Sequence, residues 1–404
     1  MKVLYIHMSG VFGGASRSLT EMITHFEENA VEPFIITPAG SFTEVLDKLS
    51  ISYIATPGIV QFDHSFLGHY RWMRWLILLR EIAFLAPTRN ALRQAQQQWP
   101  DIDLIHVNEI HCIIAVMIAK RFFKKPVVMH VRSLMVNKPQ SRRTQWIQNQ
   151  IMRHVNALIC IDETVKSYLP NGLRRFAQVV HNGFTLHSKM SFADHDIEKA
   201  IASIPKRTLT VAMIGVLISY KGVMEFLEAA KICKEQGLDV NFMLVGHNAN
   251  KLKGGTKYIL EKLSIAKDVE ANAKAYIQTH QLESHVYFLG FTTNIHLIYQ
   301  QIDVICFPSY LNAVGRPVFE AAFFKKPSIV AIRDPKPDTV VHLQTGICIP
   351  ERNATALFEA IKYYFHHPDK MTEMGLHAFD LAQSNFNVKT NTKKVLSIYK
   401  SLLS

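Results

Sequence analysis

The stretch QIDVICFPSYLNAVGRPVFEAAFFKKPSIVA, residues 301–331, has the pattern of a β-α-β unit. It holds, in order, an apolar β-rich run, a loop with one glycine, an apolar run with helical spacing and a second β-rich run: 304–307, 308–315, 318–323 and 328–332. Such a unit places its loop at the carboxyl end of a strand and at the N-terminus of a helix. Free N–H groups there suit an anion, so the loop around Gly315 predicts a phosphate site.

Glu320 lies about one turn into this predicted helix, on an otherwise apolar face. A carboxylate in that position must find hydrogen-bond donors, and the hydroxyls of a ribose are one such set. A capping or salt-bridging glutamate is the other interpretation. The residues of this unit alone leave both open.

The length and charge of the chain restrict its class. At 404 residues it is too long for one ordinary core and predicts roughly two domains. The formal net charge is +12, and residues 1–190 hold 21 Lys and Arg against 13 Asp and Glu. A basic first half implies an anionic partner such as a sugar nucleotide, a lipid headgroup or a nucleic acid. No zinc spacing or basic-aromatic motif supports a nucleic acid, so we expect none.

The cysteines and the N-terminus predict a cytoplasmic protein. The five cysteines are scattered without a C-x-x-C motif, and four lie in apolar runs, as reduced core thiols do. The first residues, MKVLYIHMSG, have a short apolar run that ends in a turn, which indicates a first strand and not a signal peptide. No run approaches the roughly 20 apolar residues of a spanning helix.

A second glycine loop follows the first predicted strand, residues 2–7. The segment SGVFGGA contains Gly13 and Gly14, and a run with helical spacing comes next. Backbone can approach a phosphate closely at such a loop, although glycines can also simply make a turn. The loop is not G-x-G-x-x-G and no acidic residue ends the following β-run, 33–37. These absences argue against a nicotinamide oxidoreductase.

Strands and helices alternate along most of the chain, which predicts an α/β protein with doubly wound parallel sheets. Polar residues gather where the predicted strands of the first half end: His7, Gly13, Asn108, His130, Arg132 and Asn182. As a set at one sheet edge they favour a site. The sequence HNGF at 181–184 has the signature of a tight turn. Residues 185–204 are polar and aperiodic, and we interpret them as a linker.

Residues 69–86, HYRWMRWLILLREIAFLA, form the most hydrophobic helical stretch, and arginines stud it. Aromatic residues with arginine on an apolar helix suit a membrane interface, so the region 69–93 is a candidate peripheral membrane contact. A buried helix with arginines at its rim, or a dimer contact, explains the same pattern.

An ordered series of segments carries a family resemblance that runs nearly end to end: VFGGASRSL, VVMHVRS, VVHNGF, IGVLISYKG, FMLVG, VYFLGF and PSYLNAVGRPVFEAAFFKKPSIV. The chain resembles a GT-B glycosyltransferase of glycosyltransferase family 4. The resemblance implies two Rossmann-like domains facing each other across a cleft, with the second holding a nucleotide diphosphate-sugar. It also implies that the last helix, about 388–403, returns to the first domain. The expected domains are 1–184 with 388–404, and 205–387.

The resemblance implies a role for several residues. Lys221 looks like the diphosphate-binding lysine, and a point charge there can neutralise a leaving diphosphate. Glu320 looks like the second glutamate of an E-x7-E motif and is expected to bind the ribose. Arg132 lies where many members have histidine or arginine facing the donor sugar and the acceptor. The remaining expected donor contacts are Gly13, Gly14, Gly215, Gly246, Ser309, Gly315 and Arg316.

Two positions depart from the family pattern. The first glutamate of the E-x7-E motif, which usually contacts the donor sugar, is Asn312. Val216 occupies the place of a second phosphate-binding basic residue, and Arg316 is near enough in sequence to compensate. These departures leave open a non-catalytic sugar-nucleotide sensor or partner subunit.

The enzyme interpretation is a transferase that uses a UDP-sugar and needs no cofactor, and the resemblance implies that it retains the anomeric configuration. We expect no metal, because the nearest D-x-D pair, Asp101 and Asp103, flanks Ile102 at the start of a strand. The expected acceptor is a saccharide or a polyprenyl-linked saccharide at the cytoplasmic membrane face.

Overall fold

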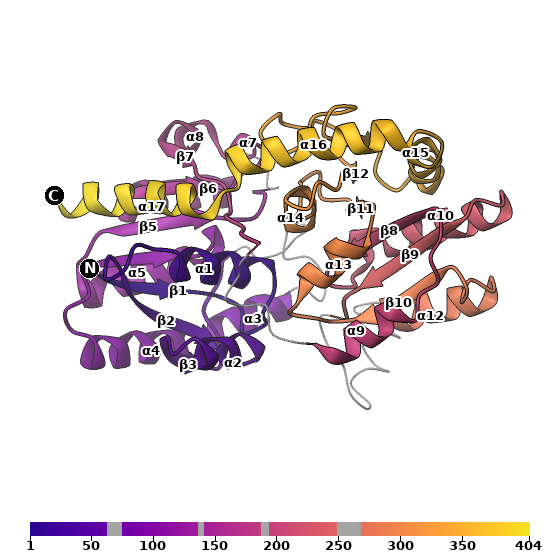
Figure 1. Ribbon diagram of the computed structural model, residues 1–404. Helices are drawn as coiled ribbons and strands as arrows, with labels where there is room; N and C mark the ends of the chain where they lie inside the picture. The colour runs from indigo at the N-terminus through magenta and orange to yellow at the C-terminus, as the bar shows by residue number, and fades with distance from the viewer. Residues whose placement is uncertain (63–74, 136–140, 187–193, 249–267) are drawn as a thin grey trace. The chain divides into compact units, whose positions relative to one another are not determined.

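The computed structural model describes residues 1–62, 75–135, 141–186, 194–248 and 268–404 (Figure 1). They form two compact units: unit 1 is Met1–Phe184 with Asn387–Ser404, and unit 2 is Thr185–Phe386. Each unit is built on one parallel sheet with helices on both faces, so the predicted pair of Rossmann-like α/β domains is confirmed.

Unit 1 has a seven-stranded sheet in the order β3-β2-β1-β4-β5-β6-β7 among the described residues. Its strands are β1 (Lys2–Ile6), β2 (Glu32–Pro38), β3 (Ser52–Thr56), β4 (Leu104–Val107), β5 (Val127–Val131), β6 (Ala157–Cys160) and β7 (Ala177–Val179). Its helices are α1 (Gly14–Thr24), α2 (Ser41–Lys48), α3 (Trp75–Ala83), α4 (Leu85–Gln98), the 3-10 turn η2 (Ile110–Cys112), α5 (Ile113–Phe123), α6 (Arg142–His154), α7 (Glu163–Ser167), α8 (Asn171–Phe176) and α17 (Val388–Leu403).

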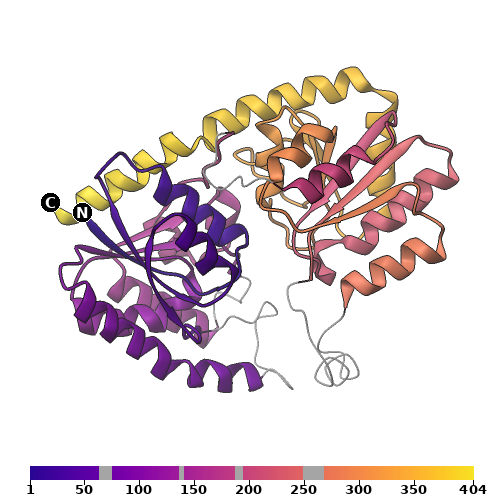
Figure 2. The same cartoon turned by 60° about the horizontal axis from the view of Figure 1, so that its bottom comes forward.

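Alternation along the strands sorts the core of unit 1 into two layers. Leu4 and Ile6 of β1 point to the face that α4, α5 and α6 cover. The opposite face carries Tyr5, whose hydroxyl lies 3.4 Å from that of Tyr399 on α17. Helix α17 lies beside α1 on this face (Figure 2), so the last helix of the chain completes the first unit.

Unit 2 has a six-stranded sheet in the order β10-β9-β8-β11-β12-β13 among the described residues. Its strands are β8 (Leu209–Ile214), β9 (Val240–Val245), β10 (Val286–Gly290), β11 (Val304–Phe307), β12 (Ser328–Ala331) and β13 (Gly346–Ile349). Its helices are α9 (His195–Ala202), the 3-10 turn η3 (Ser219–Lys221), α10 (Val223–Glu235), α12 (Val269–Thr279), α13 (Ile295–Gln301), α14 (Arg316–Ala322), α15 (Ala354–His366) and α16 (Pro368–Asn385). Helices α10, α12 and α15 cover one face, and α9, α13 and α14 the other.

Two sequence-based expectations are corrected by the structure. The segment 185–204, taken as a linker, contains α9, because Asp194 accepts a hydrogen bond from the Ile197 N–H and caps a helix whose Ile197 packs into unit 2. The Asn-Gly pair at 182–183 makes no turn. Gly183 instead lets the chain pass close to α17: a β-carbon there would lie 2.6 Å from the α-carbon of Val388.

The predicted helix 69–86 lies partly outside the described residues, which resume at Trp75. From there the structure has α3 and then α4, with a break at Phe84. All five cysteines are free, and four of them are buried, as expected of core thiols. Within the described ranges, no helix combines the length and the apolar character that crossing a bilayer requires.

Candidate active site

Both sheets contain a point where the strand order reverses. In unit 2 the chain winds from β8 outward to β10, and β11 then pairs with the other side of β8; in unit 1 the same happens at β1 and β4. Open parallel sheets bind ligands outside the carboxyl ends of the strands at such a point. The loops after β8 and β11 lie next to each other, since the Tyr310 N–H donates to the Tyr220 carbonyl at 2.9 Å.

Lys221 ends the 3-10 turn η3 in the loop after β8, and its side chain is half-buried. Its ammonium lies 4.7 Å from the centroid of the Phe307 ring, at the end of β11. No carboxylate forms an ion pair with it within the described part of the chain, and burial lowers the pKa of Lys221 to about 8. The next residue, Gly222, has φ 81°, and a β-carbon there would lie 2.1 Å from the Pro308 carbonyl oxygen. Close packing of the two loops therefore positions a cation where an anion would stabilise it.

Glu320 is buried on α14, and both of its carboxylate oxygens have partners inside unit 2. Oε1 accepts from Arg316 Nε at 2.8 Å and lies 2.6 Å from a terminal nitrogen of the same guanidinium. Oε2 accepts from the Tyr299 hydroxyl at 2.7 Å. The salt-bridging interpretation of Glu320 thus holds in this structure. Tyr299 comes from α13, and no local sequence signal identified it as a partner.

The glycine and serine at the end of β11 have packing roles. A β-carbon on Gly315 would lie 2.4 Å from the Phe307 ring, so only glycine fits beside that side chain. Ser309 is fully buried, and its hydroxyl donates to the Tyr220 carbonyl at 3.3 Å. These contacts hold the loop after β11 against the loop that carries Lys221.

Gly215 and Gly246 follow β8 and β9 and differ in what surrounds them. Gly246 has φ 144°, and a β-carbon there would lie 1.8 Å from the Gly215 carbonyl oxygen. Gly215 has φ 153°, yet a β-carbon on it would meet nothing within 4 Å. Gly246 is required by packing between the loops, whereas the backbone at Gly215 is open on its Cβ side.

Asn312 has a structural explanation that its sequence position did not suggest. Its φ is 48°, in the left-handed region that asparagine tolerates better than most residues. Its side-chain oxygen accepts from the Arg333 N–H at 2.7 Å, just after β12. The residue that replaces the family's first glutamate therefore ties two loops of unit 2 together.

At the corresponding edge of unit 1, the polar residues predicted from strand ends come together around Arg132. Its Nε donates to Asn108 Oδ1 and one terminal nitrogen to Asn182 Oδ1, both at 2.5 Å. Asn108 also hydrogen-bonds His7 Nδ1 at 2.8 Å, and His130 Nδ1 lies 3.4 Å from Arg132. Burial, aided by the Arg132 charge, lowers the pKa of His7 to about 3 and that of His130 well below its usual value. These histidines are neutral at physiological pH, and Arg132 carries the positive charge of the cluster.

Gly13 and Gly14 begin α1 at the same edge. Gly13 is the N-cap residue, and its N–H donates to the Ser16 hydroxyl at 2.8 Å. A β-carbon on Gly13 would meet nothing within 4 Å, so packing alone does not require glycine there. Gly14 is the first residue of the helix.

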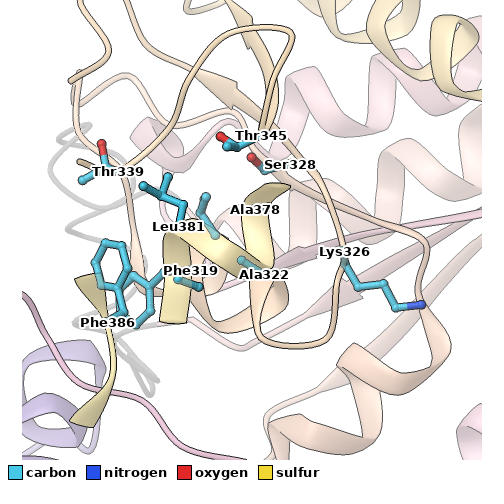
Figure 3. A pocket seen from close by; sticks show the side chains of 11 residues that line it. Phe319, Ala322, Lys326, Ser328, Thr339, Thr345, Ala378, Leu381 and Phe386 are labelled. Carbon is cyan, nitrogen blue, oxygen red and sulfur yellow. The ribbon is translucent and has the colours of Figure 1, made fainter. Parts of the chain in front are cut away.

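Each unit contains a small cavity. One in unit 2, of about 10 Å3, lies where α14 meets α16 and is lined by Phe319 and Phe386, whose rings stack at 4.4 Å (Figure 3). A second of the same volume in unit 1 touches His130 and Arg132. Each has room for one water at most. Within the described residues, no group of His, Cys, Asp and Glu is placed to hold a metal ion.

Family models match both halves of the chain. Residues 12–187 match glycosyltransferase family 4, and residues 194–379 match glycosyl transferases group 1. The chain is 23% identical over 355 residues to UDP-Gal:alpha-D-GlcNAc-diphosphoundecaprenol alpha-1,3-galactosyltransferase of Escherichia coli, covering 82% of this chain and 79% of that protein. It is 20% identical to alpha-D-kanosaminyltransferase of Streptomyces kanamyceticus over 265 residues, which is 64% of each chain.

The fold agrees with these matches. The crystal structure of Anabaena Alr3699/HepE in complex with UDP and glucose superposes with a TM-score of 0.74 at 20% identity, over 99% of this chain and 100% of the other. The chain's two matched halves and its two parallel-sheet units identify it as a glycosyltransferase of the GT-B fold that belongs to glycosyltransferase family 4.

Proposed function

We propose that this glycosyltransferase moves a sugar from a UDP-sugar to a saccharide carried on a polyprenyl diphosphate, with retention of the anomeric configuration. The donor site is the carboxyl edge of unit 2, and the Lys221 ammonium is the observation that carries the assignment. The Lys221 ammonium is partly desolvated and has no carboxylate partner among the described residues, so an anion would stabilise it, and the diphosphate of the donor supplies one.

The proposed reaction needs no nucleophile from the protein. The bond between the anomeric carbon and the diphosphate oxygen breaks, and the diphosphate departs with the electron pair, stabilised by Lys221. The acceptor hydroxyl forms the new bond on the same face, and its proton passes to the departing diphosphate oxygen. The other proposed donor contacts are in the loops around Lys221. These residues shape the loops and offer backbone groups to the donor: Gly215, Gly246, Ser309 and Gly315. No metal or cofactor takes part in this proposal.

Two comparisons support the choice of donor and acceptor. The Anabaena structure holds UDP and glucose, and the Escherichia coli relative is named for transfer from UDP-Gal to a diphosphoundecaprenol-linked sugar. In unit 1, Arg132 is fixed by two neutral amides and keeps a cationic surface for an anionic acceptor. We assign the acceptor contacts to this cluster and to the backbone at Gly13 and Gly14.

We also propose that unit 1 contacts the cytoplasmic face of the membrane through the region 69–93. Helix α3 exposes Trp75, Leu79 and Ile82 by 54–61%, and these positions share one helical face. Glu81 on the opposite side anchors the helix, since its buried carboxylate accepts from the Gln61 N–H at 2.7 Å. An outward apolar face on a basic unit suits an anionic bilayer surface.

The transfer itself is tested with the purified protein, a set of UDP- and GDP-sugars, and a polyprenyl diphosphate-linked GlcNAc acceptor. We expect product only with a UDP-sugar, and the anomeric proton coupling of the new linkage should match that of the donor. Transfer from a GDP-sugar alone would overturn the nucleotide, and an inverted product would overturn the retaining mechanism.

The membrane contact is tested by flotation with vesicles that contain anionic lipid. Leu79→Glu with Ile82→Glu should abolish flotation, because the charges oppose burial in the interface. Leu376→Glu, at a leucine 45% exposed on α16, is the matched control and should float as the wild type does. Equal flotation of all three proteins would contradict the contact. Arg71 and Arg74, also expected in this surface, lie outside the described residues.

A further inference from the structure

Arg316 forms an ion pair with Glu320, and the diphosphate of the proposed donor site is a second anion that the same guanidinium can bind. Its guanidinium is held by Glu320 in a pair whose side chains are only 8% and 4% exposed. The same guanidinium lies over the Phe319 ring, 5.2 Å from its centroid. If the Glu320 carboxylate binds a ribose, the ribose hydroxyls must donate to the carboxylate oxygen that now accepts from Arg316.

A buried guanidinium cannot leave its carboxylate without another anion, because an unpaired buried charge is strongly unfavourable. The diphosphate site lies close by. Arg316 directly follows Gly315, which packs on the Phe307 ring, and the Lys221 ammonium lies over that same ring. Val216 supplies no charge to this region.

We propose that Arg316 exchanges partners when the donor binds: it releases Glu320 to the ribose and pairs with the diphosphate beside Lys221. The inference rests on the proposed function and adds a regulatory feature to its donor site. The Arg316–Glu320 pair closes the ribose position, and only a ligand with both a ribose and an anion opens it without leaving a buried charge unpaired. The exchange thus selects nucleoside diphosphates over nucleosides.

Three probes separate the two halves of the exchange: uridine has only the ribose and base, inorganic pyrophosphate only the anion, and UDP both. Calorimetry on the full chain should give opposite shifts for Arg316→Ala. Pyrophosphate and UDP should lose affinity, roughly tenfold or more, because a charge-assisted contact is gone. Uridine should gain affinity, about tenfold, because Glu320 is already released.

Matched variants make the result specific. Arg207→Ala removes another arginine of unit 2, paired with Asp239 at the opposite sheet edge, and should shift none of the three affinities. Lys221→Ala should weaken pyrophosphate and UDP but leave uridine unchanged. Arg316→Lys keeps a charge without the fork, so it should raise uridine affinity with a smaller loss for pyrophosphate, and it serves if the alanine variant fails to fold.

The outcomes distinguish this inference from the proposed function. If wild-type protein binds UDP, and Arg316→Ala shifts uridine and pyrophosphate in the same direction or leaves pyrophosphate unchanged, the exchange is wrong and the donor site stands. If wild-type protein binds no nucleoside diphosphate and no pyrophosphate, the donor site is wrong and the exchange falls with it.

Discussion

Lys221 has a half-buried amine, and its surroundings determine how the proposed donor site responds to pH. Burial lowers the pKa of Lys221 to about 8, so the free protein carries the ammonium below that pH and the neutral amine above it. A bound diphosphate favours the ammonium and raises its pKa again. Binding of UDP above about pH 8 therefore takes up a proton.

We expect UDP affinity to fall as the pH rises from about 8, approaching tenfold per pH unit, as linkage of one proton requires. Calorimetry in buffers of different ionisation enthalpy measures both the affinity and the proton uptake. Lys221→Arg is the control, since a guanidinium keeps its charge over this range and should give a flat profile. A flat profile for the wild type would show that the Lys221 charge does not hold the ligand.

Substitution of Asn312 tests whether the asparagine at the position of the family's first glutamate has a structural role. Asn312→Glu should destabilise unit 2 by about 1–2 kcal/mol, because glutamate is less tolerant of the left-handed φ and gives up the short bond to the Arg333 N–H. Asn312→Asp keeps a short side chain and an acceptor oxygen, so it should stay close to wild type. Urea unfolding measures the difference. A glutamate variant of full stability and faster transfer would contradict the structural explanation.

The sequence indicated the candidate site residues but not the side chains that surround them, and this has a physical reason. Lys221 and Glu320 were proposed from their family positions, Asn108 from its place after a strand, and Arg132 from both. The residues that contact Glu320 and Lys221 were not predicted. Tyr299 and Phe307 make these contacts through tertiary packing, which leaves no local sequence pattern.

At the scale of elements, α17 is joined to unit 1 by a polar contact inside an apolar face. The Tyr399 hydroxyl lies 2.5 Å from His106 Nδ1, and both residues are fully buried. Tyr399→Phe leaves this ring nitrogen of His106 without that partner and should destabilise unit 1 by about 1–3 kcal/mol.

Hydrogen exchange during urea unfolding checks this, because it reports which unit opens. Tyr287→Phe removes a hydroxyl bonded at an exposed site to the Ser284 carbonyl and should cost far less. If the two variants are equally stable, the Tyr399–His106 contact contributes nothing to holding α17.

Elements with strong apolar runs were predicted well, whereas those set by capping were not. The pattern of hydrophobic residues predicted strand β11, at 304–307, and helix α14, from the apolar run 318–323. Helix α9 was missed because its apolar face is short: Ile197 is buried and Ile201 partly buried, and the Asp194 cap is the other signal. The Asn-Gly pair at 182–183 wrongly predicted a turn. Gly183 is needed instead for the close approach of the chain to α17.

At the scale of the whole molecule, the two units differ in how the chain builds them. Unit 2 is one continuous segment, Thr185–Phe386, whereas unit 1 needs its last helix from the far end of the sequence. Periodicity identified that helix but not its place, which came from the family resemblance. The N- and C-termini both lie at one end of unit 1 (Figures 1 and 2).

We expect the fragment 185–386 to fold alone and to bind UDP. The fragment 1–184 should remain unfolded, because the loss of α17 exposes Tyr5 and the apolar face of α1. Fusing residues 387–404 ahead of Met1 through a flexible linker should restore its folding. Circular dichroism and thermal unfolding measure both results, and a stable fragment 1–184 would contradict the role given to α17.

The central claim is that the carboxyl edge of unit 2 holds the diphosphate of a UDP-sugar, and UDP titration of three full-length proteins tests it most directly. Wild-type protein should bind UDP in preference to GDP, and Lys221→Ala and Glu320→Ala should each lose that binding, by roughly tenfold or more, while remaining folded. Equal UDP affinity in all three proteins would contradict the account, because the donor would then bind elsewhere.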